Sequence, residues 1–184
     1  MSLENKVNGE KPVSTAASPI APATAAQTPA AAPASVPTPP LPAPLPNPLS
    51  HLPLPFQAVD YTLKGYHLDA TVMPEHVVEA AKCLDKEGFA LDTITGVDWL
   101  VSAQMEVVYD YFHPQRFLLV VVRARLPRDN PQVPTISSVF PGANWHERET
   151  HDFFGIRFAG HPNLLPFLLP EDATYHPLRK DFTA

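Results

Sequence analysis

The residues best suited to chemistry lie in one short stretch, His146-Glu147-Arg148-Glu149-Thr150-His151-Asp152. Histidine and glutamate at this density suggest a metal-dependent hydrolase. A helical zinc site of that class needs two histidines four residues apart, with a glutamate between them. His146 and His151 are five residues apart, which turns one imidazole about 140° from the other on a helix. The spacing argues against zinc, and a stand-alone hydrolase that uses His146, Glu147, Glu149 and His151 remains only as an alternative.

Charge pairing is the other chemistry that this stretch offers. On a helix, Arg148 can pair with Asp152 and Glu147 can pair with His151, because residues four apart share a face. Three large aromatic side chains bracket these charges: Trp145, Phe153 and Phe154. A helix flanked in this way is buried on one side, where an unpaired charge is costly. We therefore expect a subunit interface here rather than a solvated surface.

Other kinds of active site lack candidates. The sequence contains no Gly-x-Gly-x-x-Gly, no Gly-x-x-x-x-Gly-Lys-Ser/Thr and no Gly-x-Ser-x-Gly motif, so nucleotide binding and serine nucleophiles are unsupported. The single cysteine, Cys83, can neither form an internal disulfide nor supply the thiolates of an iron–sulfur cluster. The net charge of −6 does not indicate a nucleic-acid surface. We expect no catalytic residue, no cofactor and no metal on this chain.

Composition separates a tail from the rest of the chain. Fourteen of the 24 prolines precede residue 56, and residues 12–55 carry no acidic or basic side chain other than His51. This composition predicts a disordered Pro/Ala-rich tail over residues 1–55, either an unstructured tether or a docking strip for a proline-recognising partner. The longest apolar run, Phe117 to Val122, is too short to cross a bilayer as a helix. No secretory signal pattern is visible at the N-terminus.

The residues after the tail predict an α+β fold. Strands are expected, in chain order, within residues 61–72, 89–99, 105–112 and 117–126. An amphipathic helix is expected over residues 74–87, and a turn or bulge at Gly96. The short connection 113–116 predicts an antiparallel hairpin. The expected fold class is a mainly antiparallel sheet with packed helices.

The last third of the chain is predicted to be less regular. Residues 126–134 form a proline-containing loop, and a short turn follows Thr135. A helix is expected over residues 143–155, closed by Gly155. We divide the chain into the tail, an α+β domain over residues 56–160 and an extended C-terminal docking segment over residues 161–184.

Several uncommon strings occur in a fixed order in the second half of the chain. They are Val-Pro-Thr-Ile at 133–136, Ala-Asn-Trp at 143–145, Glu-Arg-Glu at 147–149, Asp-Phe-Phe-Gly-Ile at 152–156, Gly-His-Pro at 160–162 and His-Pro-Leu-Arg-Lys-Asp at 176–181. On these strings the chain resembles the 30-kilodalton subunit family of respiratory complex I, the NADH-quinone oxidoreductase, and its relatives in energy-converting hydrogenases. The resemblance covers about residues 90–182.

The resemblance implies a cofactor-free subunit of the hydrophilic arm. It would bind the large subunit that forms the quinone or nickel–iron site and lie near the small iron–sulfur subunit, and those partners would hold the iron–sulfur clusters. It would be peripheral, on the cytoplasmic side of the inner membrane, and reach the membrane only through the complex. By resemblance, Arg179 and Lys180 would contact partner carboxylates. The implied subunit-interface residues are Trp145, Glu147, Arg148, Glu149, Asp152, Phe154, Gly155, His161, Pro162, His176, Pro177, Leu178, Arg179, Lys180 and Asp181.

The first hypothesis is thus a non-catalytic structural and assembly subunit of a proton-translocating NADH:quinone oxidoreductase. An equivalent subunit of a membrane-bound nickel–iron hydrogenase or formate hydrogenlyase is the alternative, since His151, Leu165 and Pro166 depart from the usual complex I pattern. A free adaptor that uses its proline-rich arm is a further hypothesis.

Overall fold

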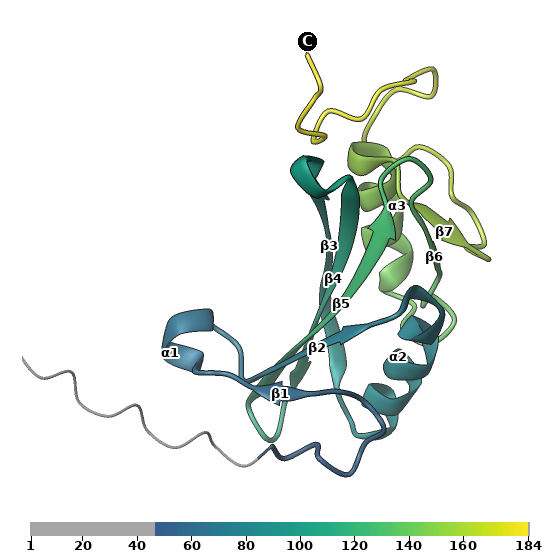
Figure 1. Ribbon diagram of the computed structural model, residues 1–184. Coiled ribbons are helices and arrows are strands. Elements are labelled where there is room, and N and C mark those ends of the chain that lie inside the picture. Colours follow the sequence, from purple (N-terminus) through teal and green to yellow (C-terminus); the bar gives the residue numbers. More distant parts are fainter. Residues whose placement is uncertain (1–46, 184) are drawn as a thin grey trace, which may run out of the picture. The chain divides into compact units, whose positions relative to one another are not determined.

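The computed structural model describes residues 47–183 (Figure 1). Residues 1–46 of the predicted tail lie outside the described residues. Residues 47–55 are described and include Leu49, which is fully buried in the core, so the predicted disorder does not extend to residue 55. Residues 47–183 contain one five-stranded sheet, one two-stranded sheet and a few short helices. The predicted α+β fold with a mainly antiparallel sheet is confirmed.

The large sheet has the strand order β1-β2-β5-β4-β3. Its strands are β1 (Gln57–Ala58), β2 (Leu68–Val72), β3 (Ala90–Trp99), β4 (Gln104–His113) and β5 (Leu118–Pro127). Only β2 and β5 run parallel, and the other neighbours are antiparallel. The last strand of the sheet to be synthesised, β5, therefore lies at its centre.

Strands β4 and β5 form the predicted hairpin. Their register runs from Gln104 opposite Pro127 to His113 opposite Leu118. Alternate residues of β5 point into the core, as the period of two requires. Val120, Val122 and Ala124 are fully buried.

The predicted first strand is only partly correct. Residues 61–64 form the short helix α1 (Tyr61–Lys64), and β2 begins at Leu68. The Asp60 carboxylate accepts a hydrogen bond from the Thr62 N–H, and Gly65 ends the helix at φ 78°. A capping aspartate and a left-handed glycine favour a helical turn over the extended chain that Tyr61 and Thr62 would otherwise prefer.

Helix α2 (Val77–Lys86) confirms the predicted amphipathic helix. It follows a 3-10 turn, η1 (Pro74–His76), that starts at Pro74. Its inward face contributes Val77, Ala80, Ala81 and Leu84 to the same core as β5. Apolar spacing alone identified this helix, because a face repeating every 3.6 residues must be buried against a partner.

Gly96 lies inside a continuous strand, which corrects the predicted break. The irregularity in β3 falls between Leu91 and Thr93 instead. A Cβ atom at Gly96 would lie 2.5 Å from the Phe154 ring. The glycine is required because a helix packs closely against the strand, and it does not form a turn.

The rest of the described chain lies around helix α3 (Ala143–Phe154). The predicted loop 126–134 and the segment after Gly155 contribute strands β6 (Gln132–Pro134) and β7 (Arg157–Ala159), which pair in parallel. The turn after Thr135 is confirmed, and the Thr135 hydroxyl accepts from the Ser137 N–H. None of the helices within residues 47–183 has the length and apolar character needed to cross a membrane.

Candidate docking surface on helix α3 and the C-terminal ribbon

Residues 161–183, which we call the C-terminal ribbon, are irregular, as predicted. Figure 1 shows the ribbon, in yellow, at the end of the sheet where α3 and the β3–β4 turn lie. Helix α3 begins after Gly142 and ends at Gly155, whose φ is 73°. The polar residues of this helix determine how the ribbon lies.

Glu147 of α3 is completely buried. Its carboxylate accepts hydrogen bonds from the Ile136 N–H and the Thr135 hydroxyl. The His161 Nε2 lies 3.8 Å from the Glu147 Oε2. Burial raises the pKa of Glu147 to about 7, although both hydrogen bonds act in the opposite direction. Glu147 thus joins the helix to the turn after Thr135 from inside the domain.

His161 shares this buried environment. Its side chain is shielded from solvent, and its Nε2 lies 3.3 Å from the Asn144 carbonyl oxygen. Burial lowers the pKa of His161, against the effect of that carbonyl. Burial therefore favours the neutral forms of both members of the Glu147–His161 pair.

Asp152 fixes the middle of the ribbon. Its Oδ2 accepts hydrogen bonds from three successive backbone N–H groups, those of Phe167, Leu168 and Leu169. Burial alone would raise the pKa of Asp152, but the three N–H groups together outweigh it and hold the pKa below its ordinary value. Asp152 is therefore a carboxylate that positions backbone within its own chain.

Arg148, one helical turn before Asp152 on α3, binds the same part of the ribbon. Its guanidinium donates to the carbonyl oxygens of Leu165 and Pro166. The guanidinium also lies over the rings of Trp145 and Phe167, at 5.3 Å and 4.9 Å from their centroids. Cation–π contacts of this kind favour one fixed arrangement of the three side chains.

The predicted pairs along α3 are wrong. In the described chain, Arg148 donates to ribbon carbonyls instead of pairing with Asp152, and Glu147 binds Thr135 and Ile136 instead of His151. The His151 Nδ1 lies 2.9 Å from the Ile156 carbonyl oxygen. Contacts from distant segments have replaced the local ones.

The C-terminal end of α3 is covered by the ribbon. The Arg179 Nε donates to the Phe154 carbonyl oxygen, and the His176 Nδ1 lies 2.8 Å from the Asp152 carbonyl oxygen. A Cβ atom at Gly155 would lie 2.5 Å from both side chains. Gly155 is thus needed for its left-handed backbone and for the space that His176 and Arg179 occupy.

A second buried carboxylate, Asp98 of β3, holds the end of the ribbon. Arg128 donates to both Asp98 oxygens, at 2.8 Å and 3.0 Å, and the Lys180 N–H also donates to Asp98. Arg128 further donates to Asp181. The hydrogen bonds from Arg128 and Lys180 hold the pKa of Asp98 below its ordinary value. Sequence reasoning missed this site, although Asp98 shares the inward phase of β3 with Ile94.

The predicted interface residues therefore divide into groups by burial. Glu147 and Asp152 are buried and bind their own chain. The residues that are half-buried as whole residues are Arg148, Phe154, Gly155, His161, His176, Pro177 and Arg179. The side chain of His161 is itself shielded from solvent. Exposed positions are Trp145, Glu149, Pro162, Leu178, Lys180 and Asp181.

The ribbon exposes six large apolar side chains, of which sequence reasoning singled out only Leu178. Leu168 and Leu178 are 52% and 53% exposed. The other exposed apolar residues of the ribbon are Leu165, Phe167, Tyr175 and Phe182. Exposed Trp145 lies beside them, with its ring centroid 5.0 Å from that of Phe167. The polar groups of the ribbon's backbone are thus bound inward while its apolar side chains face solvent. We call this outward face the apolar face.

Within residues 47–183 there is no group of three or more His, Cys, Asp or Glu side chains arranged to hold a metal ion. The fold and the site thus define an α+β domain whose ribbon exposes several apolar side chains, a feature that is typical of protein–protein contacts.

The chain belongs to the family of the respiratory-chain NADH dehydrogenase 30 kDa subunit, whose family model matches residues 70–184. The predicted resemblance is therefore confirmed. The NADH-quinone oxidoreductase C subunit of Roseiflexus sp. (strain RS-1) is 40% identical over 119 residues, which cover 62% of this chain and 68% of that protein. The F(420)H(2) dehydrogenase C subunit of Methanosarcina mazei is 43% identical over 96 residues, which cover 50% of this chain and 59% of that protein.

A solved structure extends the comparison. A chain in the structure of the membrane-bound sulfane sulfur reductase, an archaeal respiratory membrane complex, superposes with a TM-score of 0.59 at 29% identity. The match covers 63% of this chain and 71% of that chain. The relatives are thus C subunits of the complex I type and a chain of a related membrane-bound complex.

Proposed function

We propose that this chain is a non-catalytic structural subunit in the hydrophilic arm of a complex I-like NADH:quinone oxidoreductase. Its apolar face docks on the large subunit that forms the quinone site. The small iron–sulfur subunit lies nearby, and the iron–sulfur clusters and the quinone are held by these partners. The complex places the chain peripherally on the cytoplasmic side of the inner membrane.

The apolar face is the observation that carries this proposal. Exposed apolar side chains are unfavourable in water, and six of them on one short segment of the surface favour an interaction site there. The backbone beneath them is already held by Asp152, Arg148 and Asp98. An ordered surface loses little conformational entropy when it binds, which favours stable association.

Exposed charged side chains add specificity to this docking. Glu149 and Lys180 are exposed on α3 and on the ribbon, and exposed charges at an interface select the partner and orient it. Lys180 donates to Asp98 only through its backbone N–H, so we assign its side chain to a partner carboxylate.

The test is assembly of the complex with a weakened apolar face. Leu168→Ser together with Leu178→Ser should remove most of the large subunit that co-purifies with the full chain from native membranes. Both side chains are about half exposed, so the unfolding midpoint of the isolated chain should stay unchanged. Leu63→Ser is the matched control, since Leu63 is 76% exposed on α1. Undiminished co-purification of the double variant would refute the docking role.

The hydrogenase alternative is tested by the same preparation. Relatives that belong to other dehydrogenase and reductase complexes show that this family is not confined to NADH-linked enzymes. Nickel bound by four cysteines in the co-purified large subunit would assign the chain to a hydrogenase. A large subunit without nickel that binds quinone would support the first proposal.

A further inference from the structure

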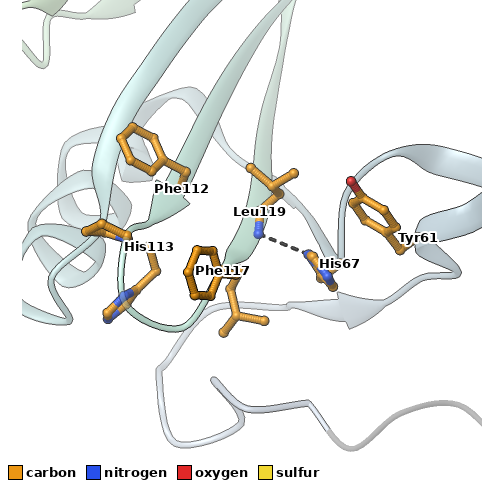
Figure 2. Close-up of a pocket in the computed structure, with 8 residues that line it drawn as sticks. Tyr61, His67, Phe112, His113, Phe117 and Leu119 are labelled. Atoms are coloured by element: carbon orange, nitrogen blue, oxygen red, sulfur yellow. Dashed lines mark hydrogen bonds between the residues drawn. The ribbon is translucent and has the colours of Figure 1, made fainter.

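A second apolar site lies at the other end of the large sheet, away from the ribbon. It is a cavity of about 570 Å³ beside the β4–β5 turn and α1. Figure 2 shows the main lining residues, Tyr61, His67, Phe112, His113, Phe117 and Leu119. No acidic or basic side chain other than the two histidines lines it. Pockets of this size and apolar character commonly bind ligands.

Phe117 lines this cavity, and both the exposure of its side chain and its backbone conformation are unfavourable. Its side chain is 82% exposed, and its backbone has a φ of 52°. A bulky residue rarely adopts the left-handed region, and such strain is concentrated at ligand clamps.

The strained turn is held from within. The His113 Nδ1 accepts hydrogen bonds from the Gln115 and Arg116 N–H groups, and the Phe117 N–H donates to the His113 carbonyl oxygen. The backbone of the turn is therefore held in place where it presents the Phe117 ring to solvent.

His67 supplies a hydrogen-bond donor among the residues that line the cavity. The His67 Nδ1 accepts from the Leu119 N–H, a contact drawn in Figure 2. The neutral imidazole consequently carries its proton on Nε2. His67 stacks on Tyr61 with ring centroids 4.6 Å apart. Aromatic side chains beside an N–H donor are features with which grooves recognise proline-rich segments, whose carbonyl oxygens have no internal partner.

We propose that this pocket binds residues 41–46 of the same chain, Leu41-Pro42-Ala43-Pro44-Leu45-Pro46. The segment carries no charge, and half of its residues are prolines, so it matches a pocket that is apolar and aromatic. Prolines restrict the free chain, which lowers the entropy lost when such a segment binds. Leucine side chains fill the cavity, and one carbonyl oxygen accepts from the His67 Nε2.

The first described residues contact a neighbour of the β4–β5 turn. The His51 Nε2 lies 3.0 Å from Glu87, and the same carboxylate pairs with Arg116, the residue before Phe117. The residues that follow Asn47 are thus attached to the flank of the β4–β5 turn. Six residues in a polyproline II conformation reach about 19 Å.

The test uses a nitroxide label on the full chain. The label is placed by Ala43→Cys in a Cys83→Ser background, and amide signals of the isotope-labelled protein are compared before and after the label is reduced. We expect Phe117, Leu118 and Leu119 to lose most of their intensity while Val101, in the β3–β4 turn, keeps its own. Phe117→Ser should abolish the loss, and Leu63→Ser should preserve it.

Three results would overturn the proposal. Equal intensity at all four amides would show that the segment does not occupy the pocket. An unchanged loss after Pro42, Pro44 and Pro46 are replaced by serine would show that proline chemistry is not recognised. A loss in isotope-labelled protein mixed with nitroxide-labelled protein of natural isotopes would identify a second copy as the occupant.

Discussion

At the scale of single residues, Glu147 shows how a charged side chain can hold a fold from inside. It belongs to α3, yet its hydrogen bonds lead to Thr135 and Ile136 on a different segment. The carboxyl group is fully buried, and its pKa is raised from 4.5 to about 7. The native state therefore holds a proton that the unfolded chain releases between these two pH values.

Glu147→Gln should make stability less dependent on pH. In the wild type, the contribution of the protonated carboxyl is complete below pH 4.5 and is lost as pH rises through about 7, because a charge must then be buried. Glutamine keeps an acceptor for the Ile136 N–H and does not titrate. From pH 5 to pH 8, the stability of the variant relative to the wild type should rise by up to about 3 kcal/mol, measured by urea unfolding.

Glu149→Gln is the control for that prediction, since Glu149 is exposed on the same helix. It should leave the pH dependence unchanged. The lowered pKa of His161 acts in the opposite direction, because stability is then lost as pH falls. His161 is present in the wild type and in both variants, Glu147→Gln and Glu149→Gln. A pH dependence equal in the wild type and Glu147→Gln would contradict the assignment.

The sequence predicted that these residues matter for the fold, but it did not predict which groups they contact. The density of charge beside Trp145 indicated a helix with one buried face, and Glu147 and Asp152 are both buried. The i,i+4 rule assigned them local partners, because a sequence read alone offers no others. Thr135 and the backbone of residues 167–169 reach the helix only through the tertiary fold.

At the scale of elements, the contact between β3 and α3 depends on Gly96. The Phe154 ring occupies the space where a side chain would begin, 2.5 Å from an ideal Cβ. This close approach allows α3 to lie against the edge strand of the sheet. The same helix carries the residues that position the ribbon, so the spacing between the two elements also affects the apolar face.

Gly96→Ala should destabilise the chain by about 1–3 kcal/mol, because overpacking forces Phe154 to move. A double-mutant cycle with Phe154→Leu provides the check by chemical denaturation. The alanine should be less destabilising in the Phe154→Leu background, where the ring is absent. An equal loss in both backgrounds would mean that the strain does not come from this ring.

Elements with strong periodicity were predictable, and those set by distant contacts were not. Helix α2 and the β4–β5 hairpin follow from apolar spacing and turn residues. Strands β6 and β7 each have only three residues and exist because they pair with each other. Helix α1 has four residues and depends on Asp60 and Gly65, signals that the β-propensity of the neighbouring residues obscured.

At the scale of the whole molecule, the ribbon folds back on its own domain. Asp152 binds its middle and Asp98 binds its end, and both pKa values lie below their ordinary range. Its irregular backbone and the family resemblance together predict a segment that docks on a neighbouring subunit. The structure shows that its own domain holds it in place, with the apolar side chains turned outward.

Asp152→Asn should loosen the ribbon while leaving the sheet intact. An amide side chain cannot match the charge-assisted acceptance of three N–H groups, and we expect a loss of about 1–3 kcal/mol. Hydrogen exchange should become faster at Phe167, Leu168 and Leu169, and less large subunit should co-purify. Glu149→Gln should leave the exchange rates as they are. Unaltered exchange at the three amides in Asp152→Asn would contradict the role of Asp152.

The strand order of the large sheet also means that β2 is synthesised well before β5, the strand with which it pairs in parallel. Leu68 of β2 pairs with Val120 of β5, 52 residues later in translation. At roughly 5–20 residues per second, β2 waits about 3–10 s with one row of its backbone polar groups unpaired. The translation rate between residues 73 and 117 therefore determines how long the nascent chain exposes an unpaired strand edge. During that time other chains or chaperones can bind this edge.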